Sequence, residues 1–275
     1  MTNFTGIRLI AADMDGTLLN SRHELNNDFH TVYGKLKAQH ILFAPASGRQ
    51  LYNLQNKFGD TGGDMIFIAE NGSHVQYKGR DILVQSLPPD KVKMLVTMAR
   101  NVPGVYIILC GKKQAYVEST VPEFMQNVEM YYDRRMIVED LLKVEDDEFL
   151  KIAICDLNGS EINSYPAFRH LEGELQVKVS GKIWLDLSHQ LANKGRALQV
   201  VQREFNISPE QTMAFGDYLN DVEMMQQAYY SYAMSNAHPS VKEVARFATK
   251  SNEENGVGEV LDQVLESFHA RQIIS

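Results

Sequence analysis

The chain has 275 residues, of which 44% are hydrophobic and 23% charged, as in ordinary globular proteins. This composition excludes a disordered, fibrous or collagen-like chain, and the length suggests about two domains. The 27 basic and 35 acidic residues give a net charge of -8, and no basic block suited to a phosphate backbone is present, so we expect no nucleic-acid partner.

The same sequence predicts a cytoplasmic protein without membrane association. The N-terminal segment lacks the basic start and the long apolar run of a signal peptide. No apolar stretch approaches the roughly 20 residues that cross a bilayer. The two cysteines, Cys110 and Cys155, are too few for a disulfide framework and end apolar runs typical of buried strands. The pattern defines no oligomeric state.

The first third of the chain alternates predicted strands and helices. Short apolar runs predict buried strands over residues 7–12, 41–44 and 65–69. Apolar residues at helical spacing predict helices over 25–36 and 51–58, with Asn26 or Asn27 able to cap the first. This alternation is typical of a doubly wound parallel sheet. A predicted hairpin, with strands 75–77 and 82–84, follows.

The pattern changes between residues 85 and 187. Helices are predicted over 90–100, 122–131 and 161–171, and strands over 105–110, 114–118, 149–156, 176–180 and 182–187. Tight turns join several neighbouring strands, which favours an antiparallel sheet. We therefore predict a separate α+β unit in this part of the chain.

After residue 188 the alternating pattern returns. Helix 194–205, strand 212–215, helix 221–228, strand 230–234 and helices 240–245 and 258–268 are predicted. The predicted fold class is thus α/β, with a doubly wound parallel sheet as the core. Residues 1–84 plus 188–275 would form that core, and residues 85–187 would form an inserted α+β domain.

Polar residues follow three of the predicted core strands. The three clusters are Asp13 with Asp15, Ser47 with Arg49, and Asp217 with Asn220 and Asp221. In an open parallel sheet, ligands bind beyond the carboxyl ends of the strands, so we expect these clusters to meet at one site. A lysine, Lys194, starts the helix that follows the inserted unit.

The first cluster suggests metal-assisted chemistry. Asp13 and Asp15 are two residues apart on an extended segment, so their carboxylates point the same way and repel unless a proton or a cation binds. Carboxylate and carbonyl oxygens without His or Cys suit Mg²⁺. One aspartate can then act as a nucleophile and the other as a proton donor and acceptor. The alternative is a capped loop at a strand end, and Asp-x-Asp alone is a weak motif; Asp-x-Asp-Gly-Thr after a buried strand favours the chemistry.

The remaining clusters have structural explanations as well. Ser47 and Gly48 offer a hydroxyl and free main-chain amides that suit a phosphoryl oxygen. The alternative is that Ser47 is an ordinary helix N-cap. Lys194 at a helix start does not improve the helix dipole, so stability alone leaves its position unexplained. Asp217 comes one step after a buried strand, where a carboxylate has little packing purpose.

At these residues the sequence resembles the haloacid dehalogenase superfamily, specifically its Cof-type sugar-phosphatase-like branch with an inserted α/β cap. Four motifs match in order over essentially the whole chain. They are Asp13-Met14-Asp15-Gly16-Thr17, Ser47-Gly48-Arg49, Lys194-Gly195, and Gly216-Asp217-Tyr218-Leu219-Asn220-Asp221. Asn71-Gly72 adds family-like context.

The resemblance implies a role for each matching residue. Asp13 would be the nucleophile and Asp15 the general acid and base, with Lys194 as a further catalytic residue. Mg²⁺ would bind the Asp13 carboxylate, the Asp15 main-chain carbonyl and Asp217, with Asp221 nearby, directly or through water. The phosphoryl group would be held by Ser47, Lys194 and Asn220 and by the Met14 and Gly48 amides.

The leading functional prediction is a Mg²⁺-dependent phosphatase of small phosphorylated metabolites, acting through an aspartyl-phosphate. A phosphomutase of related architecture and a non-enzymatic phosphometabolite-binding protein are the alternatives. Retention of both aspartates, the lysine and the metal aspartate argues against the binding protein, because unpaired buried charge is costly.

Substrate recognition is assigned to the inserted unit, and the sequence does not name the substrate. Candidate substrate residues are Arg49, Asn71, Lys182 and Trp184, and Lys112 and Lys113 are further candidates to line the site. Arg49 could instead pair with a core carboxylate, and Trp184 could instead pack between the two domains. The histidines, including His23, show no ligand spacing and are interpreted as surface or locally bonded residues.

Overall fold

A computed structural model describes residues 4–274 of the chain, in which two β-sheets are formed. The eight strands of the larger sheet run in the order β14-β13-β12-β1-β2-β3-β4-β5. They span β1 (Leu9–Asp13), β2 (Leu42–Ala46), β3 (Ile66–Ala69), β4 (His74–Tyr77), β5 (Arg80–Val84), β12 (Thr212–Gly216), β13 (Tyr230–Ala233) and β14 (Phe247–Ala248).

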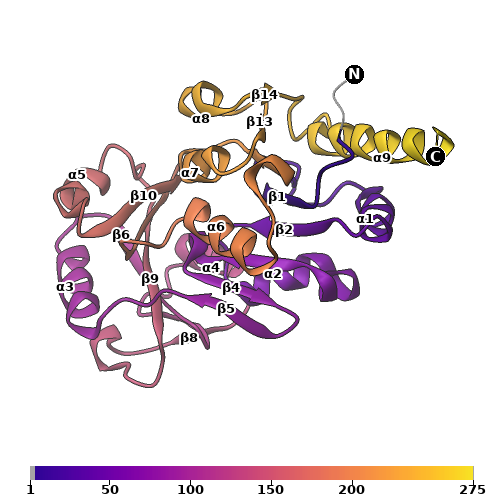
Figure 1. Ribbon diagram of the computed structural model, residues 1–275. Coiled ribbons are helices and arrows are strands. Elements are labelled where there is room, and N and C mark those ends of the chain that lie inside the picture. The colour runs from indigo at the N-terminus through magenta and orange to yellow at the C-terminus, as the bar shows by residue number, and fades with distance from the viewer. Residues whose placement is uncertain (1–3, 275) are drawn as a thin grey trace.

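The strands from β14 to β3 are parallel, and β4 and β5 form an antiparallel hairpin at the edge. Strand β1 lies between β12 and β2, so the two ends of the chain together build one domain. Figure 1 shows the indigo N-terminal and yellow C-terminal segments side by side, with helix α9 along α1. The predicted doubly wound α/β core is confirmed.

Six helices connect and cover these strands. They are α1 (Phe29–Ala38), α2 (Leu51–Phe58), α6 (Lys194–Glu204), α7 (Val222–Gln226), α8 (Pro239–Val244) and α9 (Gly256–Ile274). In α2, Leu51, Leu54 and Phe58 are buried at helical spacing. Every residue of β1 is buried, as expected of a central parallel strand covered on both faces.

The second sheet comes from the middle of the chain and forms the left side of Figure 1. Its order is β10-β11-β9-β6-β7-β8. The strands span β6 (Val105–Gly111), β7 (Ala115–Val117), β8 (Arg135–Ile137), β9 (Phe149–Asp156), β10 (Leu175–Gly181) and β11 (Trp184–His189), with helices α3 (Pro89–Arg100), α4 (Pro122–Tyr131) and α5 (Tyr165–Phe168). The pairs are antiparallel except β7 with β8, which is parallel.

Several local predictions were wrong. Strands β8 and β14 were not predicted, because runs of two or three residues carry no periodic pattern. The predicted helix 161–171 shortens to α5 and a 3₁₀ turn over Arg169–Leu171, since Pro166 fits only the first turn of a helix. Helix α1 is preceded by Asp28, without a side-chain cap, rather than by Asn26 or Asn27. None of the described helices is long and apolar enough to cross a membrane.

A strained turn between β3 and β4 packs against the main chain directly before α6. In the 3₁₀ turn η2 (Glu70–Gly72), Glu70, Asn71 and Gly72 have φ of +50°, +53° and +91°, in the left-handed region. A Cβ on Gly72 would overlap the main-chain carbonyl of Asn193, directly before α6. Only glycine therefore satisfies both the dihedral angle and the close approach.

We predict that Gly72→Ala lowers the free energy of unfolding by about 2–5 kcal/mol, because it combines left-handed strain with a backbone overlap. Gly79 is the matched control, since its φ is +75° but nothing lies within 4 Å of its added Cβ. Gly79→Ala should cost only about 1–2 kcal/mol. Urea unfolding of both variants measures the difference, and equal losses would show that the contact with Asn193 is unimportant.

Candidate active site

The three predicted polar clusters lie at one edge of the large sheet. Asp13 is the last residue of β1 and is opposite Ala46 of β2 in the register, directly before Ser47. Asp217 follows the last residue of β12, the strand on the other side of β1. The carboxyl ends of the central strands thus bring these side chains together, as expected for this topology.

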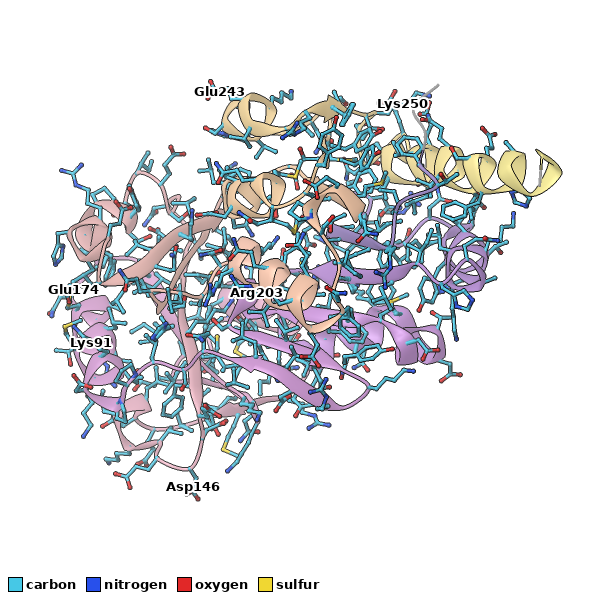
Figure 2. All side chains as sticks on the ribbon, in the orientation of Figure 1. Lys91, Asp146, Glu174, Arg203, Glu243 and Lys250 are labelled. Atoms are coloured by element: carbon cyan, nitrogen blue, oxygen red, sulfur yellow. The ribbon has the colours of Figure 1, made fainter. Side chains whose placement is uncertain are left out.

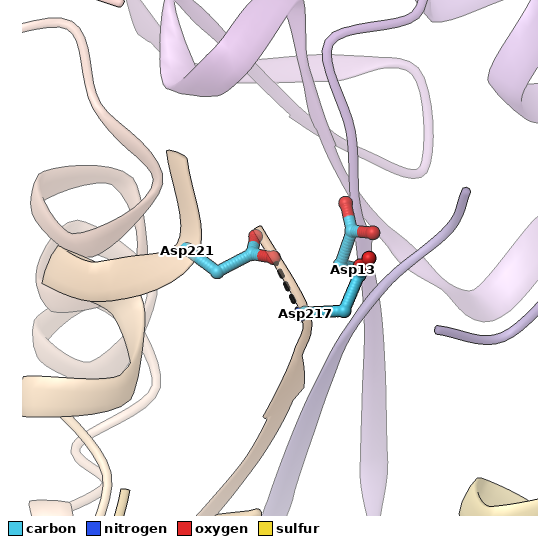
Figure 3. Close-up of side chains that lie close together, drawn as sticks. All are labelled: Asp13, Asp217 and Asp221. Atoms are coloured by element: carbon cyan, nitrogen blue, oxygen red, sulfur yellow. Dashed lines mark hydrogen bonds between the residues drawn. The ribbon is translucent and has the colours of Figure 1, made fainter. Parts of the chain in front are cut away.

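Three carboxylates converge there. One oxygen from each of Asp13, Asp217 and Asp221 lies within 4.8 Å of the others. Figure 3 shows the Asp13 and Asp217 side chains facing each other, with the Asp221 carboxylate turned back to accept a hydrogen bond from the Asp217 main chain at 3.0 Å. Thr17 donates to Asp217 at 2.9 Å and so fixes that carboxylate. A Cβ on Gly16, whose φ is +86°, would overlap Asp217, which explains the glycine of the first motif.

Lys194 supplies the positive charge nearest to this cluster. Its side chain has no exposed area, and its Nζ donates to Asp13 and, at 2.7 Å, to Asp221. Burial lowers the pKa of Lys194, but the two carboxylates outweigh burial and hold the pKa above its ordinary range. The amine is therefore a permanent cation that joins β1 to the Asp221 turn.

One ammonium does not balance three carboxylates. Burial, and next the charge of Asp221, raise the pKa of Asp13 well above its ordinary value, although Lys194 opposes the shift. Burial and Asp221 likewise raise the pKa of Asp217 to about 7. The donor set consists only of oxygen atoms, contains no His or Cys, and holds excess negative charge, which fits a hard divalent cation.

Asp15 has a different environment. Arg49 donates to it through Nε at 2.8 Å and through Nη2 at 2.5 Å, and His23 Nδ1 lies 2.8 Å from Oδ1. Burial raises the pKa of Asp15, but hydrogen bonds from His23 and Arg49 outweigh it and bring the pKa to about 2. Neighbouring aspartates of one motif are thus driven in opposite directions, which is typical of catalytic pairs.

Arg49 borders the cavity, but its side chain has no exposed area. Besides Asp15, it donates to Asn53 at 2.8 Å and to the Met130 carbonyl at 2.9 Å. Of its two sequence interpretations, these contacts favour pairing with a core carboxylate over contact with substrate. Met14 is fully buried in the hydrophobic core, which leaves only its main chain for a ligand.

The other predicted phosphate residues lie beside Asp13. Ser47 and Asn220 are both buried and both line the cavity, as does Gly48. Asn220 Nδ2 donates to Asn71 Oδ1 at 2.9 Å, and Asn71 in turn donates to Asp186. Asn71 does not line the cavity, and both ends of its amide are occupied, which argues against its interpretation as a substrate residue.

A cavity of about 320 Å³ lies between the two sheets. The second sheet and its loops contribute Lys182 and Trp184 to its walls, as predicted. Lys112 and Lys113 do not line it, and Lys112 instead pairs with Asp81 at 2.6 Å. Lys182 is exposed and makes no ion pair within residues 4–274. Trp184 meets Tyr131 edge to face, with ring centroids 5.5 Å apart, and Arg49 lies 4.5 Å from the centre of the Tyr131 ring.

Several residues of the site were not predicted from the sequence. Thr17 lies within the first motif, which was a usable signal. His23, predicted to be a surface or locally bonded residue, lies 2.8 Å from Asp15, a partner that the sequence did not indicate. Lys151, Asp186 and Tyr131 also line the cavity. A lysine inside the apolar run of β9 was a usable signal for Lys151, whereas nothing local marks the other two.

Comparison with known proteins identifies the class of protein. A family model described as haloacid dehalogenase-like hydrolase matches residues 10–261. The chain is 36% identical over 263 residues to 5-amino-6-(5-phospho-D-ribitylamino)uracil phosphatase YbjI of Escherichia coli (strain K12), covering 94% of this chain and 96% of that protein. It is 28% identical over 239 residues to HMP-PP phosphatase of Escherichia fergusonii, covering 86% of each.

Solved structures agree with this assignment. SMU.1108c from Streptococcus mutans UA159 superposes with a TM-score of 0.87 at 29% identity, covering 94% of this chain and 99% of that one. TM0651 from Thermotoga maritima gives a TM-score of 0.78 at 26% identity, covering 94% and 97%. The chain belongs to the haloacid dehalogenase-like hydrolases, which confirms the resemblance drawn from its motifs.

The raised pKa of Asp217 predicts a pH-dependent stability in the presence of EDTA. The unfolded carboxyl releases its proton near the ordinary value of 3.8, whereas the folded one keeps it to about 7. The free energy of unfolding should therefore fall as pH rises between these values, by at most about 1.4 kcal/mol per pH unit. Asp217→Asn should flatten this slope, as measured by urea unfolding at several pH values. Parallel curves for the two proteins would contradict the raised pKa.

Proposed function

We propose that this protein is a Mg²⁺-dependent phosphatase that hydrolyses small phosphorylated metabolites through an aspartyl-phosphate on Asp13. The observation that carries this proposal is the buried contact of Asp13 with Lys194, beside Asp217 and at the base of a cavity that Asp15 also lines. The relatives at 36% and 28% identity are both named phosphatases, which supports the same reaction.

Asp13, Asp217 and the Asp15 main-chain carbonyl would hold Mg²⁺, and bound Mg²⁺ would offset the charge of the carboxylates and of the phosphoryl oxygens. Both oxygens of Asp221 already accept hydrogen bonds, from Lys194 and from the Asp217 and Tyr218 amides. Asp221 would therefore serve chiefly to hold Lys194 and this loop in place, with the metal nearby.

The chain's own groups account for both halves of the reaction. In the first, an Asp13 oxygen bonds to phosphorus while the ester P–O bond breaks, and Asp15 gives its proton to the leaving oxygen. In the second, Asp15 takes a proton from water, the water oxygen bonds to phosphorus, and the bond to Asp13 breaks. Hydrogen bonds from His23 and Arg49 favour ionised Asp15, so the resting side chain is set for the second half and takes up a proton for the first.

Lys194, Ser47 and Asn220 would hold the phosphoryl oxygens, together with the Met14 and Gly48 amides. Positioning and charge stabilisation are the main requirements of phosphoryl transfer. A permanent cation in contact with the nucleophile meets both, because it orients the Asp13 carboxylate and opposes the charge that collects on the phosphoryl oxygens.

Residues 85–187 would act as a cap on a catalytic core of residues 1–84 and 188–275. In support, the segment after α4 bonds directly to α2: Gln50 exchanges hydrogen bonds with the Arg134 main chain at 2.8 and 2.9 Å, and Asn53 and Asn56 both donate to Asp133. Such a cap would exclude water and present Lys182 and Trp184 to the substrate.

The substrate to test first is 5-amino-6-(5-phospho-D-ribitylamino)uracil, the compound for which the YbjI relative is named. The edge-to-face Tyr131 and Trp184 rings offer an aromatic wall suited to a planar ring.

A cytoplasmic location fits Cys110 and Cys155, which are both buried and free of disulfides.

The decisive experiment measures phosphate release from an aryl phosphate with Mg²⁺ and with EDTA. Wild-type protein should turn over only with Mg²⁺, and Asp13→Asn should lower kcat by about a thousandfold or more while the circular dichroism spectrum is unchanged. Asp146→Asn is the control, since this exposed carboxylate lies on a distant loop (Figure 2). Full activity in Asp13→Asn would exclude it as the nucleophile. Phosphate binding without turnover would favour the binding protein, and transfer to a sugar rather than to water would favour the mutase.

A second prediction concerns the metal. Asp217→Asn should raise the Mg²⁺ concentration for half-maximal activity at least about tenfold, because it removes a charged ligand. Thr17→Val, which removes only the hydrogen bond to that carboxylate, should shift the same midpoint less. Phosphate release measured over a range of Mg²⁺ concentrations checks both, and an unchanged midpoint for Asp217→Asn would remove this residue from the metal site.

A further inference from the structure

A buried ion pair of the second sheet lies against both phosphate-binding loops of the core. Lys151 of β9 and Asp186 of β11 are 3.3 Å apart, with side chains only 2% and 4% exposed. In the register, Lys151 is opposite Ser188 and Asp186 is opposite Ala153, so the two side chains are diagonal neighbours on one face. Both line the cavity, yet neither belongs to a catalytic motif.

We propose that Lys151 and Asp186 are positioning residues, which set the phosphoryl-binding geometry of Ser47 and Asn220 from the cap side. Each acts through one intermediate group, the Gly48 peptide for Ser47 and the Asn71 amide for Asn220. This inference rests on the proposed function, in which Ser47 and Asn220 bind the phosphoryl group.

The first connection passes through one peptide unit. Lys151 Nζ donates to the Gly48 carbonyl at 2.7 Å, and the N–H of the same peptide, at Arg49, donates to Ser47 Oγ at 3.1 Å. The peptide is planar, so fixing its oxygen fixes the direction of its N–H. A hydroxyl that accepts this bond keeps its own O–H to donate elsewhere. Lys151 thus sets the direction in which the Ser47 hydroxyl can donate.

The second connection passes through one side-chain amide. Asp186 accepts a hydrogen bond from Asn71 Nδ2, and Asn71 Oδ1 accepts one from Asn220 Nδ2 at 2.9 Å. Because both ends of the Asn71 amide are bonded, its plane is fixed, and so is the position of the Asn220 side chain. The carboxylate of the cap therefore determines where Asn220 lies in the core.

A third contact joins the two connections. Lys151 Nζ lies 3.0 Å from the buried Glu70 carboxylate, in the strained turn η2. The main chain of this turn is itself bonded to the Ser47 loop, from Glu70 N to the Arg49 carbonyl at 3.0 Å and from Asn71 N to the Ser47 carbonyl at 2.9 Å. One lysine thus contacts both loops at once. Neither Glu70 oxygen accepts a hydrogen bond, so the charge of Lys151 is what compensates this buried carboxylate.

A second ion pair between the sheets offers a matched comparison. Lys178 of β10 lies 2.5 Å from Glu223 of α7, with side chains 26% and 29% exposed. It joins cap and core by a lysine and a glutamate, as Lys151 and Glu70 do, but among the described residues neither side chain forms a hydrogen bond with Ser47, Asn220 or the groups that hold them. Removing this ion pair shows how far a weaker contact between cap and core alone changes phosphate binding.

The test compares Lys151→Met/Glu70→Gln with Lys178→Met/Glu223→Gln, so that neither double variant leaves a buried glutamate unpaired. We expect the first to raise KM for p-nitrophenyl phosphate and the inhibition constant of inorganic phosphate about tenfold or more, the size of one hydrogen bond to a charged group. The second should change the inhibition constant less than about twofold. Equal inhibition constants of inorganic phosphate for the two double variants would overturn the proposal.

A double-mutant cycle tests the route through Ser47. In a Ser47→Ala background, the loss of Lys151 should raise the inhibition constant less than in the wild-type background, because the hydroxyl that it orients is gone. Full additivity of the two effects would overturn this route.

Asp186→Asn provides a variant of unchanged volume should the double variant fail to fold. The single amide oxygen of the new side chain then faces two donors, Asn71 Nδ2 and Lys151 Nζ. We expect the inhibition constant of inorganic phosphate to rise about fivefold. An unchanged inhibition constant would overturn the route through Asn71.

The failure of this inference is distinguishable from that of the proposed function. A wild-type protein that releases phosphate from no ester, with or without Mg²⁺, would contradict the phosphatase proposal. An active wild-type protein, with an unchanged inhibition constant in Lys151→Met/Glu70→Gln and in Asp186→Asn, would contradict the positioning role alone.

Discussion

Repulsion between like charges is the constraint on which the site depends. The topology places three carboxylates at the carboxyl edge of one sheet, within 4.8 Å of one another, and among the described residues Lys194 alone forms ion pairs with them. Such a cluster is unstable by itself, so the surrounding structure must hold it: Thr17 bonds Asp217, main-chain amides bond Asp221, and Gly16 leaves room for a side chain to approach. The same excess charge makes the site a strong attractor for a cation.

The electrostatic environment shifts the pKa values of the two aspartates of the first motif in opposite directions. They are two residues apart, yet Asp13 faces other carboxylates and Asp15 faces a guanidinium and an imidazole. Sequence spacing shows only that both point toward one site. Their different protonation follows from Arg49 and His23, which reach Asp15 from two other segments of the chain.

The sequence predicted the core well because its signals are local. Each central strand is a short apolar run that ends at a polar motif, and the parallel topology then brings Asp13, Ser47 and Asp217 together without further information. The contacts between the sheets could not be predicted in this way. Lys151 meets Gly48 across 103 positions of sequence and Asn71 meets Asp186 across 115, and neither pairing follows from periodicity or from a motif. Short elements such as β8 and β14 failed for the opposite reason, since they contain too few residues for a pattern.

The diagonal placement of Lys151 and Asp186 has a consequence for exchanging specificity among relatives. A second sheet transplanted from another member of the family would bring its own cavity wall, but it would also replace the groups that meet Gly48, Glu70 and Asn71. A graft that lacked an amine and a carboxylate at the same two register positions would lose these contacts with the core. Lys182 lines the same cavity but forms no ion pair within residues 4–270, so its replacement would remove no comparable contact with the core.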